Sequence, residues 1–365
     1  MRIMVTGANG FIGRNFINTV GQSRKDIEIL PYDIDSPVGT LDEYAANCDF
    51  AVHLAGVNRP KEQGEFKKGN AGFTGELVNA LEKAANPCPI LMTSSIQAQL
   101  DNPYGTSKLE AENVLREHEK KTGAKVYIYR LPNVFGKFCR PNYNSAVATF
   151  CHNIAHDLPI TVTDPKIELR LIYIDDVVRL ILDAVSGVPA DEPRPVYRAT
   201  LGHITELIYS FKNSRSTLVV PDMADEFTRK LYATYLSYLD ENDFSYDLTV
   251  HADHRGSFTE FIKTEGSGQF SVNVSRPGAV KGNHYHDTKN EKFLVVAGEA
   301  IIRFRKVGSD KVIEYRVKGC DMRVIDIPTG YTHNIENVGQ DDLITIMWAS
   351  ERFDPDRPDT YYLEV

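Results

Sequence analysis

Short apolar runs alternate with helical patterns in the first half of the chain, as in a parallel sheet covered by helices on both faces. Helical patterns at residues 70–84 and 107–121 separate some of these runs. The runs lack the polar alternation of a half-exposed strand, so we interpret them as strands buried on both faces. They are residues 2–6, 27–32, 50–54, 89–93 and 125–130. We therefore predict an α/β domain with a doubly wound parallel sheet.

The pattern changes near residue 240. Residues 226–239 show helical spacing of apolar positions typical of core packing, and the polar sequence from Asp240 to Asp243 follows. Beyond it, strand patterns separated by turns continue without a helical pattern, as in an all-β barrel or sandwich. These strands are expected at residues 256–264, 269–275, 292–306, 311–317, 322–327 and 343–348. The sequence thus predicts two domains, residues 1–243 and 244–365.

Length and composition agree with two globular domains. A chain of 365 residues exceeds the size at which a single core usually keeps growing. The net charge of -9 argues against a nucleic-acid surface, and no apolar run approaches the length of a membrane span. There is no signal-peptide pattern, and the five cysteines are scattered without a CxxC motif. We expect a cytoplasmic protein whose reduced cysteines are small buried hydrophobic residues, with no nucleic-acid or membrane partner.

A glycine-rich loop joins the first predicted strand to a helix. Glycines at this place permit a tight turn, let a pyrophosphate approach the backbone, and allow close packing of the helix on the sheet. The alternative, a purely structural turn, is weakened by the position of the loop after the first strand. The loop residues assigned to the cofactor are Gly7, Gly10, Phe11, Ile12 and Gly13. We predict a Rossmann-type dinucleotide site.

Asp33 closes the second predicted strand. An acidic side chain there can accept a hydrogen bond from the 2′-hydroxyl of the adenosine ribose and repels a 2′-phosphate, which favours NAD over NADP. Two alternatives remain open. Asp33 can be an ordinary turn or N-cap residue, and Arg14 or Arg59 can serve a phosphate.

Tyr104 and Lys108 are four residues apart on a helix and therefore share one face. A phenol is a weak acid-base group at neutral pH, and the neighbouring ammonium of Lys108 is expected to lower the pKa of Tyr104. Ser95, just past the fourth strand, can hydrogen-bond the same substrate oxygen. We predict that Ser95, Tyr104 and Lys108 are the catalytic set of a reductase, with Lys108 also binding the nicotinamide ribose.

Residues 1–240 resemble the extended short-chain dehydrogenase/reductase family that acts on nucleotide sugars. The resemblance also rests on residues 53–56, on Asn70, on the sequence from Arg130 to Gly136, and on Arg170 before residues 173–176. It implies that Leu54, Ala55 and Gly56 contact the cofactor. It also implies that Asn133 contacts the substrate near its phosphates and that Arg170 meets the diphosphate. The alternatives for these two are a strand-end cap and a surface ion pair.

Three histidines and a glutamate in the last third have the spacing of metal ligands. His284 and His286 share one face of a predicted strand, and Glu291 and His333 can complete the set. Three imidazoles and one carboxylate suit Zn²⁺ but also Fe²⁺, Mn²⁺ or Ni²⁺. These motifs resemble those of the cupin family, which implies a small metal-binding β-barrel.

The start of this domain is similar to sugar-epimerising cupins, in Asp253, Arg255, Gly256, Phe258 and Glu260. Those relatives use a His-Asp base without metal. Since the histidines here are expected to be metal ligands, the base of those relatives cannot be assigned to residues of this chain. The candidates left open by the sequence are Tyr331, Lys289 and His254.

Taken together, the two halves resemble bifunctional enzymes of capsular polysaccharide biosynthesis. The resemblance implies C3 epimerisation of a UDP-linked 4-keto-6-deoxy-N-acetylhexosamine by the cupin. Reduction of C4 by the first domain would then give UDP-N-acetyl-L-talosamine. It also implies NADPH, zinc and a homodimer, although Asp33 makes NADH an alternative. Other possibilities are a simple reductase with the cupin as a dimerisation or binding module, an iron oxygenase, and a redox-sensing regulator. The intact Tyr104 and Lys108 argue against the regulator, which would not need catalytic residues.

Overall fold

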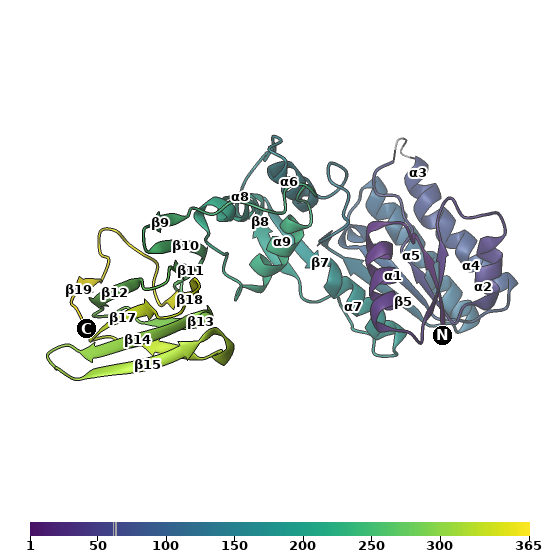
Figure 1. The fold of residues 1–365 in the computed structure, drawn as a ribbon. Helices are drawn as coiled ribbons and strands as arrows, with labels where there is room; N and C mark the ends of the chain where they lie inside the picture. The colour runs from purple at the N-terminus through teal and green to yellow at the C-terminus, as the bar shows by residue number, and fades with distance from the viewer. Residues whose placement is uncertain (61, 63) are drawn as a thin grey trace. The chain divides into compact units, whose positions relative to one another are not determined.

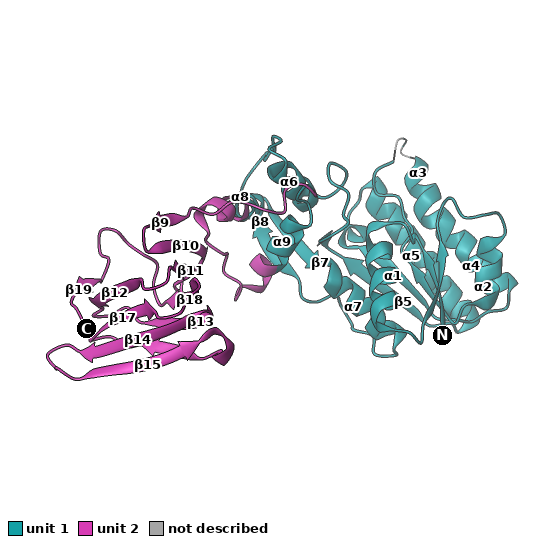
Figure 2. Cartoon of the chain, viewed as in Figure 1, with its two compact units in different colours: residues 1–209, 230–240 teal, residues 210–229, 241–365 magenta. Residues whose placement is uncertain are grey.

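The computed structural model describes residues 1–60, 62 and 64–365. The described chain divides into two compact units (Figure 2). One comprises residues 1–209 and 230–240, and the other comprises residues 210–229 and 241–365. The second unit therefore takes in a segment that precedes the polar sequence at residues 240–243.

The first unit contains a parallel sheet with strand order β2-β1-β3-β4-β5 (Figure 1). The chain leaves β1 toward β2 on one side and returns to β3 on the other, which creates a switch point at the carboxyl end of β1. The strands are β1 (Arg2–Thr6), β2 (Glu28–Tyr32), β3 (Phe50–His53), β4 (Ile90–Ser95) and β5 (Val126–Leu131). The sequence predicted all of them to within two residues.

Successive residues of these strands enter separate cores because side chains alternate across a strand. Ile3 and Val5 pack on one face with helices α1 and α7, whereas Met4 packs on the other with α4 and α5. These helices are α1 (Phe11–Ser23), α4 (Phe73–Lys83), α5 (Pro103–Thr122) and α7 (Ile174–Val185), with α2 (Thr40–Asn47) beside α4. Helices on both faces confirm the predicted doubly wound α/β architecture.

Shorter elements follow along the chain, and two of the helices among them are divided between the two units. A small sheet of order β6-β7-β8 mixes parallel and antiparallel pairs. Its strands are β6 (Asn133–Phe135), β7 (Glu168–Tyr173) and β8 (Tyr197–Thr200). The remaining helices are α3 (Gly64–Lys67), the π-helix η1 (Lys68–Gly72), the 3₁₀ helix η2 (Ile96–Gln99), α6 (Ala146–Ala155), α8 (Leu201–Thr217) and α9 (Glu226–Leu236). The sequence patterns did not predict the small sheet.

The second unit holds two antiparallel sheets, of order β16-β13-β18-β11-β10-β9 and β15-β14-β17-β12-β19 (Figure 1). Phe293 and Val295 of the first sheet pack against Ile302 and Phe304 of the second to form its core. The strands are β9 (His251–Asp253), β10 (Gly256–Lys263), β11 (Gln269–Ser275), β12 (Val280–Tyr285), β13 (Glu291–Ala297), β14 (Glu299–Lys306), β15 (Val312–Lys318), β16 (Val324–Ile327), β17 (Tyr331–Asn337), β18 (Leu343–Ala349) and β19 (Tyr361–Tyr362), with the 3₁₀ helix η3 (Gly319–Asp321) before β16. This arrangement confirms the predicted cupin-like barrel.

One predicted strand was wrong. The apolar pattern over residues 292–306 suggested a single strand, but the chain reverses at Gly298, between β13 and β14. Gly298 has φ +84, and a Cβ there would lie 2.9 Å from the Cα of Leu343. A glycine inside a strand pattern is a signal for such a turn. The patterns also missed β17, which carries His333.

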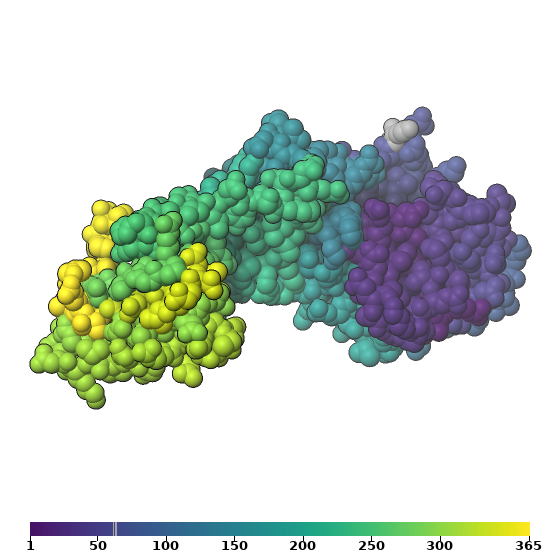
Figure 3. Space-filling model, viewed as in Figure 1, coloured from purple at the N-terminus to yellow at the C-terminus, as the bar shows by residue number. Residues whose placement is uncertain are grey.

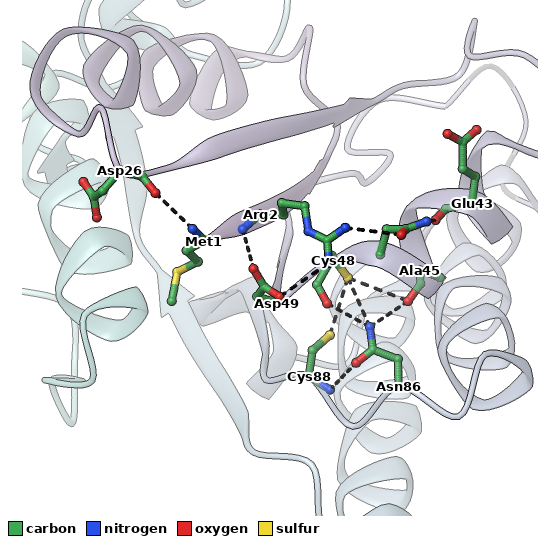
Figure 4. A network of polar contacts seen from close by, with 10 residues as sticks. Met1, Arg2, Asp26, Glu43, Ala45, Cys48, Asp49, Asn86 and Cys88 are labelled. Atoms are coloured by element: carbon green, nitrogen blue, oxygen red, sulfur yellow. Dashed lines mark hydrogen bonds and ion pairs between the residues drawn. The ribbon is translucent and has the colours of Figure 1, made fainter.

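The amino ends of the parallel strands carry a polar network (Figure 4). The Arg2 N–H donates to the Asp49 carboxylate at 2.6 Å, and Asn86 Nδ2 donates to the Cys48 carbonyl at 2.8 Å. The sulfurs of Cys48 and Cys88 are 3.6 Å apart in this network. Both cysteines are buried and unbridged, as expected. Cys320, however, is exposed, so the expectation of burial was wrong for it.

None of the described helices is both long enough and apolar enough to cross a membrane.

Candidate active site and metal centre

The glycine loop packs tightly against the loop that follows β3. Gly7 has φ +71, and a Cβ on it would lie 2.7 Å from the backbone nitrogen of Ala55. A Cβ on Gly13 would lie 2.3 Å from the Gly7 carbonyl oxygen. Side chains at either position would collide with backbone, so both glycines are required by the geometry of the turn.

The amino end of α1 is left open by this loop. Its N-cap is Gly10, which has no side chain to cap the helix, and the first turn contains no acidic residue. Unsatisfied N–H groups and the positive end of the helix dipole favour a phosphate there. A cavity of about 830 Å³ begins at this point and is lined by Gly7, Gly10, Phe11, Ile12 and Gly13. The residues present thus fit a dinucleotide.

Asp33 lies at the end of β2, beside the glycine loop. Its carboxylate accepts the N–H of Asn9 at 2.7 Å and the N–H of Ile34 at 2.8 Å. The side chain therefore orders the loop in the manner of a turn-capping residue, as the alternative interpretation supposed.

The loop after β3 forms another part of the cavity wall, through Leu54 and Gly56. The Asn70 amide fixes this loop, because its Oδ1 accepts the Val57 N–H at 3.0 Å and its Nδ2 donates to the Val57 carbonyl at 3.0 Å. Asn70 also donates to the Ser107 hydroxyl on α5 at 2.9 Å. It thereby ties the cofactor loop to the helix that carries Tyr104.

Helix α5 begins at Pro103, four residues before the start that the hydrophobic pattern suggested. The Asn102 side chain caps it by accepting the Gly105 N–H at 2.8 Å, and proline is favourable at the first helical position. Tyr104 consequently lies in the first turn and lines the cavity with Ser95. Burial raises the pKa of the Tyr104 hydroxyl above its usual range, and a hydrogen bond with Ser95 opposes this shift.

Lys108 lies one turn later and is buried. Its Nζ donates to the carbonyl of Thr93 at 3.0 Å, so this bond directs the ammonium to the end of β4. Burial lowers the pKa of Lys108 to about 8, and the buried carboxylate of Glu112 opposes the shift. The structure thus brings Ser95, Tyr104 and Lys108 to one cavity. The expectation that Lys108 lowers the pKa of Tyr104 was wrong, because that pKa is raised by burial and the Lys108 ammonium binds the Thr93 carbonyl instead.

The two predicted substrate residues occupy different surroundings. Asn133 lines the cavity, and its Nδ2 donates to the Arg170 carbonyl at 3.1 Å. Arg170 itself is exposed and absent from the cavity wall, whereas its strand neighbours Leu169 and Leu171 belong to it. Because side chains alternate along a strand, Arg170 of β7 points to the other face.

Sequence reasoning missed the segment between β6 and α6 as part of the site. Phe138, Arg140, Tyr143 and Asn144 all line the cavity, and the Arg140 guanidinium lies over the Tyr143 ring, 5.2 Å from its centroid. The available signal was an arginine followed by polar and aromatic residues a few positions after the Arg130–Gly136 segment. Arg140 is thus a cation in the cavity wall.

The four predicted metal ligands converge in the second unit. His284 belongs to β12, His286 follows that strand directly, Glu291 begins β13, and His333 lies in β17 opposite His284. One ligand atom from each residue can be chosen so that all lie within 4.8 Å of one another. Glu291 Oε2 lies 3.5 Å from Nε2 of both His286 and His333.

This geometry fits a metal ion. Ligand atoms about 2.1 Å from a tetrahedral ion lie roughly 3.4 Å apart, close to the separations found here. His286 Nε2, Glu291 Oε2 and His333 Nε2 are buried without a hydrogen-bond partner among the described residues. Such atoms are costly unless something satisfies them, and a divalent cation at the point where they converge does so.

The charges of the ligands also suit a cation. Burial, together with His333 and His286, lowers the pKa of His284 to about 4, so its imidazole is neutral near pH 7. Burial alone would raise the pKa of Glu291, but the adjacent His286 and His333 hold it well below its usual range. The neutral imidazole of His284 and the ionised carboxylate of Glu291 have the protonation states that metal binding requires.

The three residues considered as the epimerisation base differ in exposure. Lys289 is buried, and its ammonium donates to the Pro358 carbonyl at 2.9 Å and to the Thr360 hydroxyl at 3.1 Å. Tyr331 is half-buried at the start of β17, and His254 is exposed in the turn between β9 and β10. The bonds of Lys289 indicate a structural role for its charge.

Comparisons with known proteins match both halves of the chain. Residues 3–198 match the NAD dependent epimerase/dehydratase family, and residues 251–361 match the polysaccharide biosynthesis C-terminal domain. The chain is 46% identical, over 100% of its length and 99% of the relative, to UDP-2-acetamido-2,6-beta-L-arabino-hexul-4-ose reductase of Pseudomonas aeruginosa.

Solved structures agree with this assignment. The capsular polysaccharide assembling protein CapF from Staphylococcus aureus is 50% identical, with a TM-score of 0.95 and full coverage of both chains. UDP-glucuronic acid 4-epimerase from Bacillus cereus, solved with NAD, is 18% identical with a TM-score of 0.55 over 65% of this chain and 98% of its own, which shows the fold alone. The chain therefore belongs to the NAD dependent epimerase/dehydratase family, in a group that joins this domain to a polysaccharide biosynthesis C-terminal domain.

Proposed function

We propose that this protein is a bifunctional enzyme of capsular polysaccharide biosynthesis that acts on a UDP-linked 4-keto-6-deoxy-N-acetylhexosamine. The cupin domain, residues 244–365, epimerises C3, and the reductase domain, residues 1–243, reduces C4 to give UDP-N-acetyl-L-talosamine. The observation that carries the reductase part is the Tyr104 and Ser95 pair in the same cavity as the open amino end of α1. Oxidation of NADH or NADPH on addition of the UDP-linked ketone tests it, and no oxidation would contradict it.

The residues of the cavity have distinct tasks in the reduction. A nicotinamide cofactor, when bound, supplies the hydride for C4. Ser95 and Tyr104 hold the C4 oxygen, and Tyr104 delivers the proton as that oxygen becomes an alkoxide. Lys108 and the α1 amino end bind and orient the cofactor, while Asn133 and Arg140 face the substrate side of the cavity.

The proposed order follows from the chemistry of the ketone. A ketone at C4 acidifies the hydrogen on C3, so epimerisation has to precede reduction. Reduction removes the ketone and fixes the new configuration. A metal ion held by His284, His286, Glu291 and His333 would supply positive charge for the enolate oxygen of the first step. We propose zinc for this site and a homodimer for the assembly, which elemental analysis and light scattering test.

A second candidate is a reductase that uses its cupin as a dimerisation or binding module. The Pseudomonas aeruginosa relative favours this candidate, because that protein is named as a reductase and not as an epimerase. The two candidates differ in one measurable property. A true epimerase exchanges the C3 hydrogen of the substrate with solvent, whereas a binding module does not.

We expect NADH to perform at least comparably to NADPH. The Asp33 carboxylate lies against the glycine loop through Asn9 and repels a 2′-phosphate. Values of kcat/KM for both cofactors check this expectation. A preference for NADPH beyond about a hundredfold, or roughly 2.7 kcal/mol, contradicts it. Asp33→Ser should shift preference toward NADPH, whereas Asp35→Ser, at an exposed position two residues later, should leave it unchanged.

Two arginine variants test which cation binds the diphosphate. Arg140→Ala should raise KM for the UDP-sugar by roughly tenfold to a hundredfold, because a charge-assisted contact is worth about 1.5–3 kcal/mol. Arg170→Ala should have a smaller effect, because Arg170 lies outside the cavity wall. Initial rates over a range of substrate concentrations measure both. A larger effect for Arg170 would support the role that the family resemblance gave it.

A further inference from the structure

The C-terminal segment, residues 358–364, lies against the metal ligands of the second unit. Strand β19 pairs with β12 so that Tyr362 is opposite His284 and Tyr361 is opposite Tyr285 (Figure 1). The Leu363 N–H donates to the Asn283 carbonyl at 3.0 Å. In the space-filling view these last residues, in yellow, lie on the surface against the green strands of the unit (Figure 3).

Within this segment, Asp359 contacts a metal ligand directly. His286 Nδ1 lies 2.5 Å from the main-chain carbonyl oxygen of Asp359. A carbonyl can only accept, so Nδ1 carries the proton and Nε2 is left with its lone pair. That lone pair belongs to the atom 3.5 Å from Glu291 Oε2, at the point where the ligands converge. The contact therefore fixes both the tautomer and the orientation of the ring.

The carboxylate of Asp359 holds the turn between two ligands. One oxygen accepts the Asp287 N–H at 3.0 Å, and the other accepts the N–H groups of Thr288 at 2.9 Å and Lys289 at 2.7 Å. The Thr288 hydroxyl donates to that second oxygen at 3.0 Å. These residues connect His286 to Glu291, so the spacing of the two ligands depends on the bonds.

The backbone of Asp359 indicates that its position is maintained by these contacts. Its φ is +40, in the left-handed region that a residue with a side chain rarely adopts. Such a conformation costs about 1–3 kcal/mol and persists where the surroundings hold it. Lys289 adds to that support, since its ammonium binds Pro358 and Thr360 on either side of Asp359.

We propose that Asp359 is a positioning residue for the metal centre. Its carbonyl orients His286, and its carboxylate fixes the turn from Asp287 to Lys289, so that the ligands are arranged before a metal binds. This inference rests on the metal centre of the proposed function. Outer partners of ligating histidines typically account for tenfold to a hundredfold in metal affinity.

Zinc affinity of the full-length protein tests this role. The metal-free protein is titrated with Zn²⁺ against a chromophoric chelator for the wild type, Asp359→Ala, Asp359→Asn and Asp356→Ala. We expect Asp359→Ala to bind zinc tenfold to a hundredfold more weakly. Asp359→Asn should fall between it and the wild type, because an amide keeps an acceptor but points its NH₂ group at N–H donors. Asp356→Ala, at an exposed position in the same loop, should match the wild type.

A spectroscopic measurement separates positioning from general loss of structure. The visible absorption of bound Co²⁺ reports ligand geometry, and we expect it to change in Asp359→Ala while circular dichroism shows that the metal-free protein remains folded. If Asp359→Ala does not fold, Asp359→Asn provides the same comparison. If the Asp359 variants had the zinc affinity and the Co²⁺ spectrum of the wild type, the positioning role of Asp359 would be overturned but the metal centre would not. A wild-type protein that binds neither Zn²⁺ nor Co²⁺ would overturn the metal centre itself.

Discussion

Replacing Tyr104 with phenylalanine is expected to lower the rate of ketone reduction by about a thousandfold, or roughly 4 kcal/mol in the barrier. The substitution removes one oxygen, which contacts Ser95 and which we propose as the donor of the proton to the C4 alkoxide. Burial raises the pKa of this phenol, so it is protonated at neutral pH and available as a donor. For the same reason loss of this donor should lower kcat/KM only as pH rises through that pKa, above the pH near 8 at which Lys108 loses its charge. Single-turnover oxidation of NADH and a pH profile measure these effects.

The selectivity of the effect is the stronger test. Tyr104→Phe should leave exchange of the C3 hydrogen unchanged, because that step belongs to the other domain. Tyr209→Phe, at an exposed position on α8 outside the cavity, should keep full reductase activity. Normal hydride transfer in Tyr104→Phe would remove Tyr104 from the mechanism.

Replacing His333 or His284 with alanine is expected to empty the metal centre and to abolish C3 exchange. Either change leaves three ligands, and loss of His333 also removes one of the two imidazoles that lie 3.5 Å from the Glu291 carboxylate. Bound metal stabilises the fold by about 1.4 kcal/mol for each tenfold excess of free metal over Kd. The melting temperature of the cupin should therefore fall and should no longer respond to added zinc. Elemental analysis, calorimetry and proton exchange measure the three effects.

The control for these variants is His251→Ala, at an exposed position on β9 outside the ligand cluster. It should retain about one metal per chain and normal exchange. Reduction of a substrate that already has the inverted C3 configuration should survive in all three variants, since the reductase residues are untouched. A wild-type preparation that is free of metal and fully active would show that the metal assignment is wrong.

Local sequence patterns predicted the parts of the fold that follow from hydrophobicity and spacing over a few neighbouring residues. Continuous apolar runs gave the parallel strands, because strands buried on both faces have no polar alternation. The convergence of His284, His286, Glu291 and His333 could be predicted because metal-binding side chains are of few types and occur at restricted spacings. The glycines of the cofactor loop were identifiable because a side chain at Gly7 or Gly13 would meet backbone.

Features that depend on contacts between distant segments were not accessible in this way. The orientation of Arg170 depends on the register of β7, which no local pattern predicted. Arg140 lines the cavity from a loop that has no periodic hydrophobic pattern. The direction of the Lys108 ammonium depends on Thr93, fifteen residues earlier. Asp359 lies 73 residues from the histidine that it orients. Only the folded chain brings these groups together.

The central claim is that C3 epimerisation precedes C4 reduction, and proton NMR in heavy water tests it most directly. The full-length protein is incubated with the UDP-linked 4-keto-6-deoxy-N-acetylhexosamine, first without a nicotinamide cofactor and then with NADH or NADPH. Our account predicts deuterium at C3 in the absence of cofactor, followed by a C4-reduced sugar that carries this deuterium with inverted C3 configuration. A reduced sugar that retains its original C3 hydrogen would contradict the account and leave a reductase whose cupin serves assembly or binding.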